Sequence, residues 1–325
     1  MLRIATQAFA TAAIAAVLAG FAAAPALAQD YPTRPVEVIV PFGAGGSSDI
    51  VARTIQQALE GKFPQPVVVV NKPGAAGSLG TAEVTDAEPD GYTILSSHIG
   101  IAINEALGVS DIGYDDFEPV AETGRTDLVF AVPTDSPYQT FDEVIAAAKE
   151  KPNAITHATN LGSVVHFTML GVTKATGAEF RYVQVGGGGE RLPVVVGNQV
   201  ESALFGVSEA LPYHESGEMR ILAILTDERW PALPDVPTAK ELGYDLPEPT
   251  SLGYWYFAPK GTPQERIDIL ADAIEAAMTS EEMKASFQER GFSPSFLRGE
   301  AFAQAVNDAD ANIKLLAEEF GVTSQ

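Results

Sequence analysis

Residues 36–53 read VEVIVPFGAGGSSDIVAR, which is a β-branched run, a glycine-rich turn and the start of a helical pattern. Valine at every second position of the run favours a strand, and Pro41 lacks the N–H that would extend its pairing. The glycines allow backbone conformations that other residues avoid, and Ser47 or Ser48 can cap a helix. Such a junction directs backbone N–H groups and the positive end of a helix dipole at one place. The stretch therefore predicts a site for an anion.

Two nucleotide-binding motifs do not fit this turn. No Lys-Ser or Lys-Thr pair follows the glycines, as a P-loop requires, and Ser48 stands where the third glycine of the dinucleotide fingerprint would fall. A glycine-rich turn can also serve only to make a tight corner between a strand and a helix. From these residues alone that alternative stays open.

The beginning of the chain has the pattern of a secretory signal. Arg3 precedes an apolar run over residues 12–24, and Ala26-Leu27-Ala28 supplies a small-x-small cleavage site. The run is short and rich in alanine for a membrane span. We expect residues 1–28 to be removed and the mature protein to be exported. Because the sequence has no cysteine, disulfides, thiolate catalysis and a lipid on an N-terminal cysteine are excluded.

The formal net charge of −23 bears on the partners of the chain. Nucleic acids and anionic membranes attract basic surfaces, so the acidic balance argues against both. Charge spread over a surface affects solubility more than it affects one pocket, and local N–H groups can still hold an anion. No cofactor is expected.

A β–loop–α pattern repeats along the first part of the chain. Strands are predicted at residues 36–40, 67–70 and 92–95, and Ser96, Ser97 and His98 follow the third of them. This repeat favours a parallel sheet, whose carboxyl edge is where such folds bind ligands. The second glycine-rich turn, residues 71–80, is expected to be a packing corner, with contact to the ligand as the alternative.

The middle of the chain predicts a second α/β unit inserted into the first. Strands are expected at 117–126 and 128–132, interrupted around Gly124-Arg125, and further along at 155–159, 180–185, 200–205, 219–225 and 251–257. Thr159 ends one of these strands. Helices are expected from residue 263, at 280–291 and at about 300–319, whereas 230–249 is expected to be a linking loop. The predicted organisation is lobe I, residues 29–125 plus 252–325, and lobe II, residues 126–251, with a ligand cleft between them.

Short motifs in a fixed order resemble the tripartite tricarboxylate transporter receptor proteins, also called Bug proteins. They cover nearly all of the chain after residue 30, and their joint order is specific although each motif alone is weak. The motifs are Tyr31-Pro32-x-Arg34-Pro35, Val38-Ile39-Val40-Pro41-Phe42-x-x-Gly45-Gly46-x-x-Asp49-x-x-Ala52-Arg53, Asn71-x-Pro73-Gly74-Ala75-x-Gly77, Pro89-Asp90-Gly91-Tyr92-Thr93, Gly162-x-x-x-His166, Gly197-x-Gln199-Val200, Pro234-Asp235-Val236-Pro237-Thr238 and Ala258-Pro259-x-Gly261-Thr262-Pro263.

The resemblance implies an α/β, type II-like, two-lobed periplasmic binding protein with a mixed sheet flanked by helices in each lobe. It would be a monomer that closes around a small carboxylate and delivers it to a two-subunit membrane permease. The turn 42–49 would hold the proximal carboxylate, and loops of the second lobe would face it across the cleft. Together with the strand ends, the expected ligand-binding residues are Phe42, Gly43, Ala44, Gly45, Gly46, Ser47, Ser48, Asp49, Ser96, Ser97, His98, Thr159, Gly162, Ser163, His166, Gly186, Gly187 and Phe205.

Asp49 is expected to buttress the turn from the first turn of the helix, because a bare carboxylate would repel an acid. Its alternative role is contact with an amine or hydroxyl of the ligand. Phe205 and Trp255 depart from the family's pattern, which often has an acidic residue and a glycine there. If both face the cleft, an aromatic or branched acid suits the pocket better than citrate; the alternative is that both belong to the core.

An exported hydrolase and a ligand sensor are the alternative functions. The sequence has no Gly-x-Ser-x-Gly elbow, and its four histidines, His98, His157, His166 and His214, do not have metal-ligand spacing. A Ser97/His166 or a Ser163/His98 pair across the cleft is the arrangement that a hydrolase could use. A sensor that presents bound ligand to a signalling receptor is not separated from a transport receptor by these residues.

Overall fold

The computed structural model describes residues 31–322, of which residues 34–322 belong to one compact unit. The predicted signal, residues 1–28, lies outside the described residues. Within residues 31–322 no helix is both long and apolar enough to cross a membrane. The account below concerns the compact unit.

One mixed sheet runs through the unit, with the strand order β2-β1-β3-β9-β4-β7-β5-β6 and with β8 and β10 also paired to β4. The strands are β1 (Val36–Val40), β2 (Val67–Asn71), β3 (Thr93–Ser97), β4 (Phe117–Pro133), β5 (Thr156–Thr159), β6 (Arg181–Gln184), β7 (Ser202–Gly206), β8 (Met219–Ile224), β9 (Ser251–Pro259) and β10 (Ser293–Leu297). β1 pairs in parallel with β2 and β3, and β5 pairs in parallel with β6 and β7. The strands of each parallel set therefore end at a common edge.

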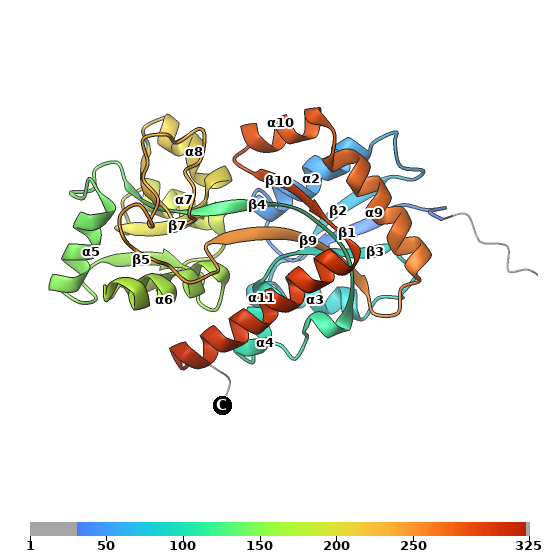
Figure 1. Cartoon of the computed structure of the whole chain (residues 1–325), viewed down its shortest axis with the longest axis horizontal. Helices are drawn as coiled ribbons and strands as arrows, with labels where there is room; N and C mark the ends of the chain where they lie inside the picture. Colours follow the sequence, from blue (N-terminus) through green and yellow to red (C-terminus); the bar gives the residue numbers. More distant parts are fainter. Residues whose placement is uncertain (1–30, 323–325) are drawn as a thin grey trace, which may run out of the picture. The chain divides into compact units, whose positions relative to one another are not determined.

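β4 joins the two parallel sets because it is long enough to pair with both parts of the sheet. Up to Asp127 it pairs with β9, and from Leu128 it pairs with β7 (Figure 1). The predicted break at Gly124-Arg125 was wrong. The ladder with β9 instead shifts register between Glu122 and Gly124, and β10 pairs with β4 at the same place. We call one part of the sheet the first half; it contains β1, β2, β3, β9, β10 and β4 up to Asp127. The second half contains β5, β6, β7, β8 and the rest of β4.

Helices follow most of the parallel strands and cover the sheet. They are α2 (Ser47–Leu59), α3 (Ser78–Thr85), α4 (Gly100–Ala106), α5 (Phe141–Glu150), α6 (Val164–Thr176), α7 (Gly188–Val196), α8 (Val207–Glu215), α9 (Gln264–Met278), α10 (Glu281–Glu289) and α11 (Gly299–Phe320), with short 3₁₀ turns η1 (Ala75–Gly77) and η2 (Tyr114–Asp116). The expected strand–turn–helix at residues 36–53 is present as β1 and α2. The region 230–249 contains no helix or named strand, as expected.

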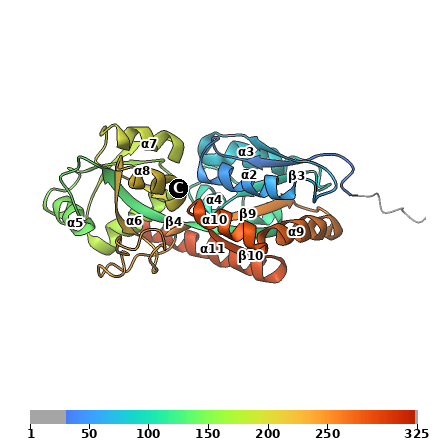
Figure 2. The same ribbon diagram turned by 90° about the horizontal axis from the view of Figure 1, so that it is seen from above.

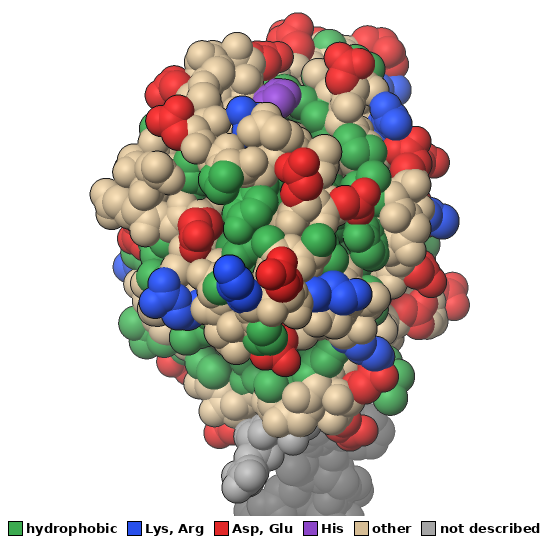
Figure 3. All heavy atoms as spheres, turned by 90° about the vertical axis from the view of Figure 1, so that its left-hand side faces the viewer, with side chains coloured by type: hydrophobic (Ala, Val, Ile, Leu, Met, Phe, Trp, Pro, Cys, Tyr) green, Lys and Arg blue, Asp and Glu red, His purple; other side chains and the backbone are tan. Residues whose placement is uncertain are grey.

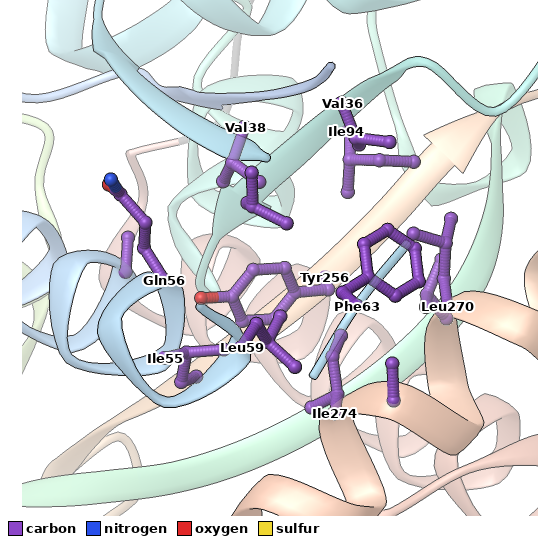
Figure 4. A pocket seen from close by; sticks show the side chains of 14 residues that line it. Val36, Val38, Ile55, Gln56, Leu59, Phe63, Ile94, Tyr256, Leu270 and Ile274 are labelled. Carbon is purple, nitrogen blue, oxygen red and sulfur yellow. The ribbon is translucent and has the colours of Figure 1, made fainter. Parts of the chain in front are cut away.

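The core of the first half contains a small cavity of about 20 Å³ where α2 and α9 pack against the sheet. Figure 4 shows side chains from β1, α2, β3, β9 and α9 around it, including Gln56 and Tyr256. Apart from a few polar atoms such as the Tyr256 hydroxyl, its walls are aliphatic and aromatic. A space of this size accommodates about one water molecule. It is too small for a carboxylic acid, so a ligand site has to lie elsewhere.

Acidic and basic side chains are mixed on one face of the molecule. On the face seen in Figure 3, acidic side chains are scattered and basic side chains lie among them. This face offers no patch of a single sign that would direct a polyanion or a polycation.

Candidate functional site

A cleft of about 650 Å³ lies where the carboxyl edges of the two parallel strand sets face each other. Helices α2, α3, α4, α6, α7 and α8 all begin at residues that line it or directly after such residues. In Figure 2, α7 and α8 lie on one side and α2 and α3 on the other. The first backbone N–H groups of a helix have no partner within the helix, and the helix dipole is positive at that end. The cleft of this acidic protein is therefore locally favourable for an anion.

The first turn places free amides at the cleft. Gly46 is the N-cap of α2, with φ −78° and ψ 167°, and no side chain caps the helix there. Gly46, Ser47 and Ser48 line the cleft. Within the described residues, no acceptor bonds to the amide of Gly46 or Ser48, whereas the Ser47 amide donates to Glu209 Oε1 at 3.3 Å. The Gly46 and Ser48 amides are available to a ligand.

The Asp49 carboxylate stabilises this turn through hydrogen bonds. Its Oδ2 accepts from the Gly45 amide at 2.9 Å, and its Oδ1 accepts from Arg53 Nε and Asn71 Nδ2, both at 2.9 Å. Asn71 also donates to the Phe42 carbonyl oxygen at 3.1 Å, which ties the turn to the end of β2. Burial alone would raise the pKa of Asp49, but the hydrogen bonds from Gly45, Arg53 and Asn71 outweigh it and lower that pKa.

Replacing Asp49 by asparagine should lower the free energy of unfolding at pH 7 by about 1 to 3 kcal/mol, because a buried network loses its negative charge and one of its two acceptor oxygens. The folded pKa lies below that of the unfolded chain, so this stability is fully present above about pH 3.9 and is lost as the pH falls through the folded pKa. Urea unfolding at several pH values measures it, with the exposed Asp111→Asn as control. A difference between wild type and variant that stays the same at pH 3 and pH 7 would contradict the assignment.

The second glycine-rich turn also lines the cleft, through Pro73, Gly74, Ala76 and Gly77. The turn is therefore part of the cleft wall and is not only a packing corner. Ala75 and Ala76 have φ values of 45° and 54°, in the left-handed region that alanine seldom occupies. Asn104 of α4 donates to the Ala76 carbonyl oxygen at 3.1 Å and so supports this conformation. Strained backbone of this kind is concentrated at ligand sites.

His98 lies on the floor of the cleft as a neutral ring. It stacks on Phe42 with ring centroids 4.5 Å apart, and its Nδ1 accepts from the Gly100 amide at 2.9 Å. Burial lowers the pKa of His98 to about 4. With Nδ1 as acceptor, the proton of the neutral ring is assigned to Nε2.

The second half of the sheet contributes the loops before α6 and α7 to the cleft, together with Gly206 and Glu209 at the start of α8. The other lining residues of this half are Asn160, Gly162, Ser163, Val164, Val165, Gly186, Gly187, Gly188, Gly189, Glu190 and Arg191. Ser163 Oγ donates to the Asn160 carbonyl oxygen at 2.6 Å, and the Gly162 amide donates to His166 Nδ1 at 3.2 Å. In residues 31–322 no hydrogen bond joins Ser97 to His166 or Ser163 to His98. Neither of the two serine–histidine pairs is therefore formed among the described residues.

The structure brings most of the predicted site residues together. Those that line the cleft are Phe42, Gly43, Ala44, Gly46, Ser47, Ser48, His98, Gly162, Ser163, Gly186 and Gly187. Those that it does not bring to the cleft lining are Gly45, Asp49, Ser96, Ser97, Thr159, His166 and Phe205. Gly45 and Asp49 bond to each other, and Ser96, Ser97 and Thr159 are buried in the sheet.

Phe205 and Trp255 both belong to the core. Phe205 has no exposed surface, and Trp255 is 6% exposed. The Trp255 ring packs edge-on against Phe257 and Phe302, and its Nε1 donates to Glu122 Oε2 at 3.1 Å. These two side chains therefore do not make the pocket bulkier.

Three charged residues of the cleft, Glu190, Arg191 and Glu209, were not anticipated from the sequence. Arg191 is the fourth residue of α7. A cation near the start of a helix is unfavourable because that end of the helix dipole is positive. This unusual placement is a signal that can be read from the sequence. Glu209 lies in the first turn of α8, where an acid is an ordinary cap, so nothing marked it. Its Oε2 accepts from the Gly206 amide at 3.3 Å while its Oε1 reaches Ser47 across the cleft. In residues 31–322 no cluster of side chains is suited to hold a metal ion.

Comparisons with known proteins agree on one family. The model of the tripartite tricarboxylate transporter family receptor matches residues 51–322. Protein BugT of Bordetella pertussis is 35% identical over 279 residues, which cover 84% of this chain and 85% of that protein. The solved structure of the periplasmic binding protein BugD is similar with a TM-score of 0.83 at 28% identity, covering 91% of this chain and 100% of that one.

Two further solved structures have an acid in their titles. An R. palustris protein with adipate has a TM-score of 0.84 at 28% identity, covering 90% of this chain and 99% of that one. MatC from Rhodopseudomonas palustris with bound malate has a TM-score of 0.79 at 27% identity, covering 88% and 99%.

Proposed function

The chain belongs to the tripartite tricarboxylate transporter receptor family, and we propose that it captures a small carboxylate in the cleft and delivers it to the membrane permease of such a transporter. The family consists of periplasmic solute-binding receptors, so the chain is a receptor and not an enzyme. Its export by residues 1–28, its release without a lipid anchor and its monomeric state are parts of the proposal.

The observation that carries the proposal is a pair of amides at the start of α2 that have no hydrogen-bond acceptor within the described residues. Gly46 and Ser48 line the cleft, and their N–H groups lie at the positive end of the helix dipole. A carboxylate can accept from both, and such charge-assisted hydrogen bonds are about twice as strong as neutral ones. Adipate and malate in the two similar structures support a carboxylate as the ligand class.

We propose further that the receptor closes around its ligand through β4 and β9. These strands connect lobe I, residues 29–125 plus 252–325, with lobe II, residues 126–251. β4 changes partner between Asp127 and Leu128, opposite the start of β9 at Ser251 and Leu252. A ligand that contacts both lobes would favour the closed arrangement by its extra contacts there.

Incubation with carboxylic acids such as adipate and malate should raise the melting temperature without consuming the acid. A ligand at about 100 times its dissociation constant stabilises the folded state by about 2.7 kcal/mol. The matching amides of the acids, which carry no negative charge, are the control. Small-angle scattering on the same samples should show a monomer whose radius of gyration falls with the acid.

Two outcomes would contradict the proposal. The first is a melting temperature that responds to the amides as strongly as to the acids, because a site made for carboxylates would distinguish them. The second is turnover of an acid, which belongs to an enzyme.

A further inference from the structure

Arg191 is a buried cation in the cleft that forms no ion pair within residues 31–322. Its side chain lines the cleft although the residue is only 5% exposed. Nη1 donates to the Gly186 carbonyl oxygen at 2.9 Å, and the guanidinium carbon lies 5.6 Å from the centre of the Phe205 ring. Nε is buried and has no acceptor in residues 31–322, and no carboxylate there lies within ion-pair distance of this guanidinium.

The two acidic groups whose charges act on Arg191 form no direct pair with it. Burial lowers the pKa of Arg191, and the charges of Glu209 and Glu190 offset only part of this lowering. Each Glu209 oxygen accepts from a backbone amide, that of Ser47 or that of Gly206. The Glu190 carboxylate lies against Gly186, where a side chain would collide with it. Neither acid therefore neutralises Arg191 in a direct pair.

A buried guanidinium in this state is costly. Removing a charge from water is unfavourable unless a counter-charge and further hydrogen bonds compensate for it. One carbonyl oxygen and a ring face supply only part of that compensation. Arginine, with its fork of donors, is well matched to a carboxylate, which can accept two of them at once. The cleft thus holds two separate places for acidic groups, the amides at the start of α2 and the guanidinium on α7.

We propose that Arg191 is a specificity-determining residue that binds a second acidic group of the ligand, so that the receptor prefers acids with two carboxylates over acids with one. This inference rests on the proposed capture of a first carboxylate by the α2 amides. The two groups come from opposite sides of the cleft, because α2 follows β1 in the first half and α7 follows β6 in the second. A diacid would therefore bridge the halves.

The test compares acids of equal chain length that carry one or two carboxylates. Succinate, glutarate and adipate are titrated by calorimetry beside butanoate, pentanoate and hexanoate. The wild-type protein should bind the best diacid about 10- to 100-fold more tightly than its monoacid, the range expected for a charge-assisted contact. R191Q should lose that advantage, with the diacid weakened about 10- to 100-fold and the monoacid changed less than about threefold.

Two further variants separate ligand contact from folding and from net charge. R191K keeps the positive charge and should keep part of the preference for diacids. Arg290→Gln removes one positive charge from an exposed site at the end of α10 and should leave the preference unchanged. If R191Q weakens monoacid and diacid equally, or if R191K shows no preference, Arg191 is structural and the inference fails.

The wild-type protein distinguishes this inference from the proposed function. Equal affinity for monoacids and diacids overturns the role of Arg191 alone, since capture of one carboxylate remains. Failure of every acid to bind overturns the proposed function and the inference with it.

Discussion

Replacing Gly46 by valine should weaken the binding of carboxylic acids by about 100-fold or more, because it places two methyl groups where the acid has to approach the Gly46 and Ser48 amides. The loss of two charge-assisted hydrogen bonds accounts for an effect of this size. The backbone at Gly46, with φ −78° and ψ 167°, suits valine, and a Cβ there would meet only the Gly43 carbonyl oxygen at 3.6 Å. The protein should therefore remain folded. Calorimetric titration with adipate or malate measures the change.

Gly46→Ala is the matched control for this variant. A single methyl group fits the same space and should weaken binding by less than about tenfold, so the two substitutions separate steric obstruction from the loss of glycine itself. The account of the first turn would fail if Gly46→Val bound acids as well as the wild-type protein does.

Replacing Phe130 by alanine should lower the free energy of unfolding by about 3 to 5 kcal/mol, as expected for removal of a buried aromatic side chain. Phe130 lies on β4 in the second half of the sheet and has no exposed surface. Its ring packs against Phe141 at 5.1 Å and Phe180 at 6.1 Å between centroids. Phe141 begins α5 and Phe180 directly precedes β6, so the side chain connects α5 with the sheet. Urea unfolding gives the free energy by linear extrapolation.

The control for Phe130→Ala is Leu315→Ala on α11. Leu315 is 65% exposed, and truncation of an exposed side chain changes stability by less than about 0.5 kcal/mol. A Phe130 variant that lost no more stability than the Leu315 variant would show that the core of the second half does not depend on this ring.

Local signals explain why β1 and α2 could be predicted from residues 36–53. Alternating valines, a proline at the strand end and the glycines of the turn act within a few residues of each other. The expected cap at Ser47 or Ser48 was wrong, because Gly46 is the N-cap of α2 and no side chain caps the helix there. α4 was missed because Gly100–Ala106 is short and almost uniformly buried, so its sequence has no two-sided periodicity. β10 was missed because it contains Pro294 and is only half-buried, both of which weaken a strand pattern.

The predicted break in β4 shows a limit of local reasoning. Gly124 has φ +149°, and a side chain there would come within 2.7 Å of the Ser293 carbonyl oxygen of β10. The glycine therefore permits close approach of a neighbouring strand and does not end β4. Nothing near Gly124 in the sequence reveals that residue 293 lies beside it.

The candidate site also has parts that could be predicted from local sequence and parts that could not. Backbone sites such as Gly46, Ser48 and Gly187 could be predicted because glycine-rich turns have a local cause. Whether a strand side chain faces the cleft or the core depends on sheet pairing, and for that reason Phe205 was misplaced. Arg191 was overlooked although a cation near the start of α7 is a local signal. Four glycines before Arg191 drew attention to the loop and not to the cation that follows it.

A crystal structure of the protein with adipate or malate tests the central claim most directly. We predict a carboxylate oxygen within hydrogen-bonding distance of the Gly46 and Ser48 amides, with the rest of the acid reaching toward α7. An acid bound elsewhere, with these amides facing solvent or covered by side chains, would contradict the claim.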